Sequence, residues 1–125
     1  MPKQVLRDPD DGGRRRSFSQ AVEAHGLVFV AGQVGDAGTG TVVEGGIETE
    51  VRQALANVGR ILGSAGLDLT DVVKATVYLV DMGDFAAYDR VWREHFPADP
   101  PTRATVAVAG LVPPYRFEVE VIAAR

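Results

Sequence analysis

Residues 47–80 read IETEVRQALANVGRILGSAGLDLTDVVKATVYLV, a helical pattern followed by a strand pattern. In the first half, apolar residues recur every three or four positions, which predicts an amphipathic helix over residues 47–64. These residues are Ile47, Val51, Leu55, Val58 and Leu62. Gly66 follows where a left-handed helix C-cap is expected. Residues 71–80 alternate as in a strand. One side would carry Val73, Ala75, Val77 and Leu79, and the other Lys74, Thr76 and Tyr78.

Further elements are predicted on both sides of this segment. Residues 18–22 and 27–32 are short apolar stretches that flank a turn at 23–26, which predicts a strand, a turn and a second strand. Residues 35–46 contain five glycines and predict a loop. Asp84 is expected to be the N-cap of a second helix. An aromatic stripe follows at helical spacing, and we interpret it as core packing. Its members are Phe85, Tyr88, Trp92 and Phe96.

The predicted order ends with two strands, at residues 103–109 and 116–123, so it is strand, strand, helix, strand, helix, strand, strand. Two helices are too few to cover both faces of such a sheet, and we expect an α+β fold with both helices on one face. On the last strand, alternation turns Phe117, Val119 and Val121 toward the helices and Glu118 and Glu120 away. On the preceding strand, Val106 and Val108 are expected to face the helices. Arg103, Thr105, Ala107 and Ala109 would then share the outer face with the glutamates.

Arg103 and Glu118 are the candidate functional residues. A charge in a half-buried strand is costly unless it has a partner. A guanidinium can hold a carboxylate bidentately, and a glutamate can accept a proton from water, so the pair indicates a small-molecule site. Two alternatives stay open: Arg103 as a structural ion-pair partner across an interface, and Glu120 in place of Glu118. In a regular hairpin Glu118 would lie nearer Ala107 than Arg103, so long side chains or a neighbouring subunit would have to complete the site.

Composition bounds the class of protein. The chain has 125 residues, enough for one domain, which we expect at residues 17–125 after a polar, loosely ordered arm at 1–16. Without cysteine it has no disulfide, thiolate nucleophile or cysteine-ligated metal. A signal peptide and an apolar run long enough to span a bilayer are both missing, which predicts a cytoplasmic protein without a membrane partner. A net charge of −4 argues against a nucleic-acid partner.

Six motifs, in order along residues 17–124, resemble those of the RidA family, also called YjgF. Each motif is weak by itself, but their collinearity is specific. They are Phe18-Ser19-Gln20-Ala21-Val22, Val28-Phe29-Val30-Ala31-Gly32-Gln33-Val34, Gln53-Ala54-Leu55-Ala56-Asn57, Asp71-Val72-Val73-Lys74-Ala75-Thr76-Val77-Tyr78-Leu79, Pro101-Thr102-Arg103 and Glu118-Val119-Glu120.

The resemblance implies a chorismate-mutase-like fold with a mixed sheet, assembled as a homotrimer with ligand clefts at the subunit interfaces. It also implies hydrolysis of reactive 2-imino and enamine acids to 2-keto acids and ammonia, as in a 2-iminobutanoate/2-iminopropanoate deaminase. No cofactor is implied. The family's carboxylate-binding arginine falls on Arg103, its water-positioning glutamate on Glu118, and its ligand-contacting glycine on Gly32.

Four positions depart from the family pattern and put the substrate range in question. Phe18 stands where a tyrosine is frequent, Ala31 where a serine is, Thr105 where a cysteine is, and Asp89 where an asparagine is. All four are expected to line the substrate site. The departures at Phe18 and Ala31 keep open one alternative, a non-catalytic sensor or carrier of small carboxylates. The resemblance brings a second, an RNA-cleaving translation inhibitor, which is an activity attributed to some relatives. The acidic net charge argues against the second.

Overall fold

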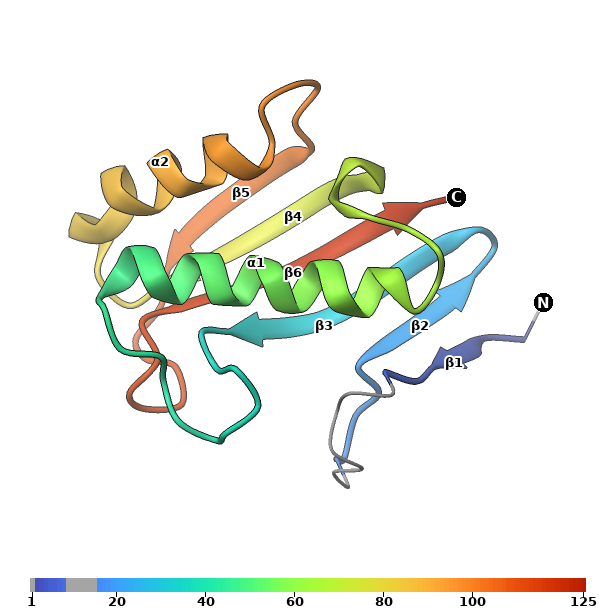
Figure 1. Cartoon of the computed structure of the whole chain (residues 1–125), viewed down its shortest axis with the longest axis horizontal. Coiled ribbons are helices and arrows are strands. Elements are labelled where there is room, and N and C mark those ends of the chain that lie inside the picture. Colours follow the sequence, from blue (N-terminus) through green and yellow to red (C-terminus); the bar gives the residue numbers. More distant parts are fainter. Residues whose placement is uncertain (1, 9–15) are drawn as a thin grey trace.

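Six strands form one mixed sheet in the order β1-β2-β3-β6-β4-β5. The computed structural model describes residues 2–8 and 16–125, and Figure 1 shows the arrangement of the elements. The strands are β1 (Gln4–Leu6), β2 (Ala21–Ala24), β3 (Leu27–Val34), β4 (Val72–Leu79), β5 (Thr102–Ala107) and β6 (Phe117–Ala124). The helices are α1 (Ile47–Gly63) and α2 (Phe85–His95), with short 3-10 helices at Leu69–Asp71 and Met82–Asp84.

The two α-helices follow their sequence signals. α1 ends one residue before the predicted boundary, and Gly66 has the expected left-handed φ of 74°. Asp84 precedes α2 but makes no capping hydrogen bond with its side chain, contrary to expectation. Instead Asp81 accepts the backbone N–H of Gly83 at 2.8 Å, because a 3-10 turn has been inserted before α2. β2 and β3 are joined by His25 and Gly26, whose φ values of 54° and 77° suit a two-residue hairpin turn.

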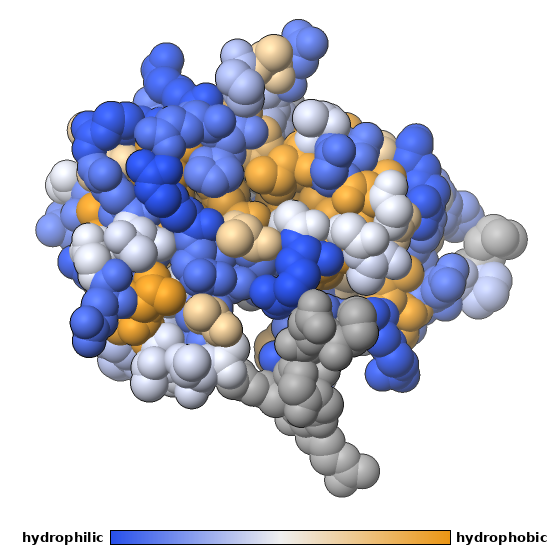
Figure 2. All heavy atoms as spheres, in the orientation of Figure 1, coloured by the Kyte–Doolittle hydropathy of each residue, from blue (hydrophilic) through white to orange (hydrophobic). Residues whose placement is uncertain are grey.

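Both helices lie on one face of the sheet, as predicted, and the core lies between them and the strands (Figure 1). On the side that carries the helices, hydrophilic and neutral residues cover most of the surface, with apolar patches between them (Figure 2). Ala75, Val77 and Leu79 of β4 are buried there, but Val73 is 46% exposed, which corrects the prediction. The register of β4 against β6 shifts between Val72 and Lys74, so this bulge turns Val73 to the other face.

The last two strands are not neighbours. β5 pairs in parallel with β4, and β6 lies between β3 and β4, antiparallel to both. The prediction that these two strands pair as a hairpin, which rested on their closeness in sequence, is therefore wrong. The connection through α2 makes β4, α2 and β5 a crossover unit, and the long loop at 108–116 returns the chain to the middle of the sheet.

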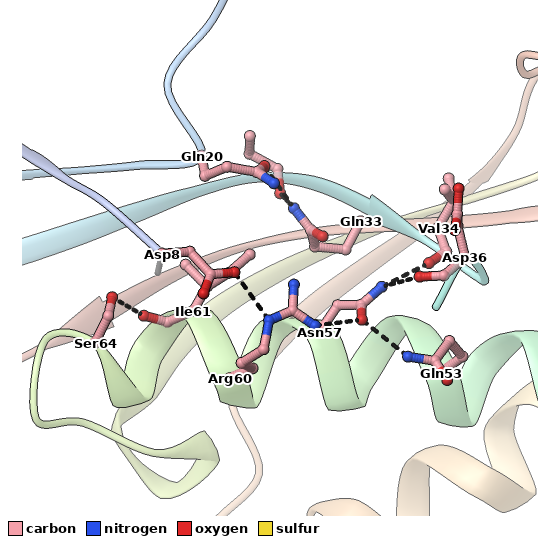
Figure 3. A network of polar contacts seen from close by, with 11 residues as sticks. Asp8, Gln20, Gln33, Val34, Asp36, Gln53, Asn57, Arg60, Ile61 and Ser64 are labelled. Carbon is pink, nitrogen blue, oxygen red and sulfur yellow. Dashed lines mark hydrogen bonds and ion pairs between the residues drawn. The ribbon is translucent and has the colours of Figure 1, made fainter. Parts of the chain in front are cut away.

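A polar network fixes the end of β3 against α1. The Asn57 side-chain amide donates to the carbonyl oxygens of Val34 at 3.1 Å and of Asp36 at 2.9 Å (Figure 3). Its oxygen accepts from Gln53 at 2.9 Å and from Arg60 at 3.0 Å. Asn57 is 4% exposed, so these bonds satisfy a buried amide and place the last residues of β3.

Part of the predicted N-terminal arm forms a strand. β1 pairs antiparallel with β2, and Asp8 accepts a hydrogen bond from Arg60 at 2.9 Å. The polarity of this region gave no signal for an edge strand of three residues. Residue 1 and residues 9–15, half of the arm that is predicted to be loosely ordered, lie outside the described residues. None of the described helices is long and apolar enough to cross a membrane.

Candidate functional site

Arg103 is held on the aromatic stripe of α2. Its guanidinium carbon lies 5.6 Å from the ring centroid of Phe85, 5.1 Å from that of Tyr88 and 5.3 Å from that of Trp92. These distances are within the range of cation–π attraction. The rings therefore fix the plane and position of the guanidinium as well as filling the core. The side chain remains 23% exposed.

An ion pair with Asp89 completes the setting of Arg103. The Arg103 Nη1 donates to Asp89 Oδ1 at 2.8 Å, and Arg93 donates to Asp89 Oδ2 at 3.0 Å. The hydrogen bonds from Arg103 and then Arg93 hold the pKa of the Asp89 carboxyl below its ordinary value. Among the described residues, Asp89 is the hydrogen-bond partner of Arg103, through one of its five N–H groups. The other N–H groups are thus left for a ligand.

A hollow of about 500 Å³ opens beside this pair. That volume is within the range of small-molecule pockets, roughly 300–1,000 Å³. Its walls combine the charged side chains with aromatic and proline residues. The lining residues are Asp89, Trp92, Arg93, Phe96, Pro97, Pro100, Pro101 and Arg103. A carboxylate next to Arg103 would therefore have apolar surface beside it.

Arg103 and Thr105 face the helices, which corrects the prediction that they share the outer face with the glutamates. Arg103 pairs in register with Ala75, and Thr105 with Val77, both of which are buried under the helices. The Thr105 hydroxyl hydrogen-bonds the Tyr88 hydroxyl. β5 turns these polar side chains toward the helices because α2 provides aromatic rings for the Arg103 guanidinium and the Tyr88 hydroxyl for Thr105. Val106, predicted to face the helices, is 43% exposed, and Val108 lies beyond the end of β5.

A second group of candidate residues lies on the opposite face of the sheet, around Glu118. Its neighbour is Gly32, at an irregularity of β3 where the register against β6 shifts between Val30 and Gln33. A Cβ at Gly32 would lie 2.5 Å from Oε2 and 2.8 Å from Cδ of Glu118. The missing side chain of Gly32 therefore makes the space that the carboxylate occupies.

The structure distinguishes Glu118 from Glu120, which alternation could not. The Tyr78 hydroxyl donates to Glu120 at 2.6 Å, and Glu120 is exposed. Glu118 is half-buried, and within the described part of the chain it forms no hydrogen bond or ion pair. Burial raises the pKa of the Glu118 carboxyl above its ordinary value, and the charge of Glu120 raises it further. Of the two carboxylates, that of Glu118 is therefore the more buried and the one without a hydrogen-bond partner among the described residues.

Two further residues, Glu50 and Tyr88, help to position Glu118 and Arg103, and neither was predicted as a site residue. Glu50, fully buried in α1, accepts the backbone N–H of Arg116 at 3.0 Å and its Nε at 2.7 Å, which fixes the start of β6 two residues before Glu118. The signal was present, because Glu50 lies three residues after Ile47 on the apolar face of the helix. Tyr88 was assigned only to the core, although it also contacts Arg103 and Thr105.

Two candidates remain, Ala31 and Phe18. Ala31 precedes Gly32, and its backbone N–H donates to the carbonyl of Gln20 at 2.9 Å, which ties β3 to the segment that carries Phe18. Phe18 is 57% exposed. Six of the seven predicted residues thus form two groups on opposite faces: Arg103, Asp89 and Thr105 in one, and Glu118, Gly32 and Ala31 in the other. The described residues contain no cluster of histidine and acidic side chains suited to a metal ion.

A Gly32→Ala substitution is expected to lower kcat by about tenfold to a hundredfold, because the new methyl group displaces the Glu118 carboxylate. Thermal stability should hardly change, since the contact is with the end of a flexible side chain. Steady-state turnover of an imino acid, the substrate class that the family resemblance implies, and a thermal melt would check both expectations. Gly110→Ala is the matched control, as a Cβ there meets nothing within 4 Å. Unchanged kcat in the Gly32 variant would separate this glycine from the site.

The sequence and the fold are similar to those of known proteins. Residues 13–125 match the family described as Endoribonuclease L-PSP. A goat (Capra hircus) protein named 2-iminobutanoate/2-iminopropanoate deaminase is 45% identical over 107 residues, 85% of this chain and 78% of the relative. The human protein of that name is 41% identical over 122 residues, 97% of this chain and 89% of the relative. The crystal structure of E. coli TdcF with bound serine has a TM-score of 0.83 at 34% identity, covering 90% of this chain and 91% of that one.

Proposed function

Since the chain belongs to the Endoribonuclease L-PSP family, we propose that it is a hydrolase that converts reactive 2-imino and enamine acids to 2-keto acids and ammonia. This family match confirms the resemblance to the RidA family, and a solved relative is itself named RidA. The observation that carries the proposal is the setting of Arg103: a guanidinium fixed on three rings, with N–H groups left over, beside a hollow. Relatives 41–45% identical are named as deaminases of such imines.

Arg103 binds the substrate carboxylate in this proposal. The planar guanidinium can form two parallel hydrogen bonds with a carboxylate, a geometry that lysine cannot copy. Because the rings and Asp89 already hold the side chain, little conformational entropy is lost when the substrate binds. This fixes the imine carbon at a defined distance from the guanidinium.

Glu118 activates water. The carboxylate accepts a proton as the water oxygen bonds to the carbon of the protonated imine and the C=N electron pair moves to nitrogen, giving a neutral carbinolamine. Glu118 then returns the proton to the amine nitrogen, the C–N bond breaks with its electron pair going to the departing ammonia, and the hydroxyl group gives its proton to Glu118 as the keto acid forms. The raised pKa of Glu118 suits the first step, because the carboxylate is then a better base than an exposed glutamate.

A second copy of the chain completes the site. β4 lies between β5 and β6, and Arg103 and Glu118 point to opposite faces of the sheet, so one chain does not present both to one small ligand. A cleft between copies, with Arg103 from one and Glu118 from the next, satisfies both roles. Such a contact joins two different surfaces and closes into a ring, and the family resemblance makes it a homotrimer.

The open face of the sheet supports this assembly. It presents large apolar side chains that the helices do not cover, including Phe29 at 42%, Val73 at 46% and Val106 at 43% exposure. Apolar surface of this kind is expected at an interface. Analytical ultracentrifugation should give a mass three times that of the 13.3 kDa chain.

Ammonia release tests the proposed function. An amino-acid-oxidising enzyme would generate 2-iminobutanoate and 2-iminopropanoate in situ, and the rate of ammonia release would be measured with and without the protein. Faster release than the spontaneous hydrolysis supports the proposal. Binding of 2-oxobutanoate without any acceleration would instead indicate a carrier or sensor. The departures at Phe18 and Ala31 motivate this alternative, and bound serine in a solved relative favours it.

The pH dependence of kcat is expected to report Glu118. The group must be ionised to accept a proton, and its pKa is raised above the ordinary 4.5, so kcat should fall as the pH drops through that raised value. Glu120→Gln removes a like charge, which lowers the Glu118 pKa and shifts the acidic limb to lower pH. Profiles of kcat against pH for both proteins would check this. An acidic limb at the same pH in both would contradict the assignment.

A further inference from the structure

We propose that Asp89 and Arg103 together form a site selective for ligands that have a cationic nitrogen on the carbon next to a carboxylate. The 2-iminium acid then binds more tightly than its 2-keto product. The inference rests on the proposed function, in which Arg103 binds the substrate carboxylate. It adds a charge partner for the nitrogen, and it explains what the chain gains from an aspartate at this position.

The two charges are presented side by side to the same space. Asp89 Oδ1 and Arg103 Nη1 are 2.8 Å apart, and both residues line the hollow. The side chains keep 19% and 23% of their surface exposed, so each has room for a ligand atom. In a 2-iminium acid, the nitrogen and the nearer carboxylate oxygen are about 3 Å apart, because they are attached to adjacent carbons. The spacing of the protein charges therefore matches that of the ligand charges.

The charge of Asp89 acts differently on substrate and product. A 2-keto acid has only oxygen atoms near this pair, so the carboxylate of Asp89 repels it and offsets part of the attraction of Arg103. A 2-iminium acid has an N–H donor and a positive charge that Asp89 attracts. Arg93 offsets Asp89 little, because that side chain is 80% exposed and its charge is screened by solvent.

The selectivity serves the direction of the reaction. Protonation makes the imine carbon electrophilic, and an adjacent carboxylate stabilises the protonated form. When water has replaced nitrogen, the remaining keto acid no longer has the cation that Asp89 attracts. Product therefore leaves the site more readily than substrate does.

Calorimetric binding of two matched probes tests the inference. 2-Oxobutanoate and L-2-aminobutanoate share one carbon skeleton and differ in the group on the second carbon. We expect wild-type protein to bind the amino acid more tightly, and Asp89→Asn to reduce the preference for the amino acid by about tenfold or more, as expected for loss of a partly buried charge pair. Asp84→Asn, which removes the same charge just before α2, is the control and should leave the preference unchanged.

The outcomes separate this inference from the proposed function. A purely structural role of Asp89 would weaken both probes equally, so an unchanged ratio in Asp89→Asn overturns the inference. Failure of wild-type protein to bind either probe overturns it too. The deaminase assay on wild-type protein decides the proposed function independently, because ammonia release needs no preference between the two probes.

Discussion

Arg103→Ala is expected to lower kcat/KM for 2-iminobutanoate by about two to three orders of magnitude, because the substrate loses a charge-assisted, bidentate partner. The guanidinium also fixes the imine carbon, so kcat should fall together with the rise in KM. Arg103→Lys keeps the charge but loses the planar fork, and it should recover only part of the activity. Ammonia release over a range of substrate concentrations gives both constants.

Loss of Arg103 also removes the partner of Asp89 and the cation from the three rings, so folding has to be checked separately. Circular dichroism and ultracentrifugation of the variant would show whether it is folded and assembled. Arg52→Ala is a matched control, since it breaks an exposed ion pair with Glu94 on neighbouring helices. Full activity of a folded, assembled Arg103→Ala protein would disprove the carboxylate-binding role.

Glu118→Gln is expected to lower kcat by about 10²- to 10⁴-fold, because an amide of the same shape cannot accept the proton from water. KM should change little, since Arg103 supplies the binding of the carboxylate. Single-turnover measurements with excess enzyme would isolate the hydrolytic step from imine formation.

Glu120→Gln is the matched control for Glu118, as it changes the same group two residues away on the same face. Its amide oxygen can still accept from the Tyr78 hydroxyl, and that hydrogen bond is exposed, so the substitution should cost little stability. A large loss of kcat in Glu120→Gln together with an active Glu118→Gln protein would show that Glu120, and not Glu118, activates the water.

The helices and the covered sides of β4 and β6 were largely predictable because their signals are local. The spacing of Val51, Leu55 and Val58 defines the buried side of α1 without knowledge of any other element. Phe117, Val119 and Val121 likewise identify the inner side of β6. Such periodicities arise from the geometry of a single element, and they are preserved in the folded chain.

The side on which Arg103 lies was not predictable from alternation. Val106 and Val108 suggested the inward side of β5, but the inward neighbours there are the rings of α2, which attract a guanidinium, and the hydroxyl of Tyr88. The strand order was equally hidden, because parallel pairing of β5 with β4 depends on the crossover through α2. Both facts depend on contacts between elements far apart in sequence.

Family motifs selected Glu118 and Gly32, but only the structure shows why they belong together. The β3 irregularity beside Gly32 leaves space for the carboxylate, and a bulge of this kind has no signature in a single sequence. A second bulge, in β4, explains why the prediction for Val73 was wrong, because it turns this residue outward. Glu50 was not predicted because it is a buried charge among the apolar residues of α1.

Mixing two inactive variants tests most directly whether the site is shared between copies. Arg103→Ala and Glu118→Gln proteins would be dissociated together, reassembled in equal amounts and assayed for ammonia release. If each cleft takes Arg103 from one copy and Glu118 from the next, about a quarter of the clefts regain both groups, and activity should rise to about a quarter of the wild-type value. Mixed assemblies that form but stay as inactive as the separate variants would contradict the account.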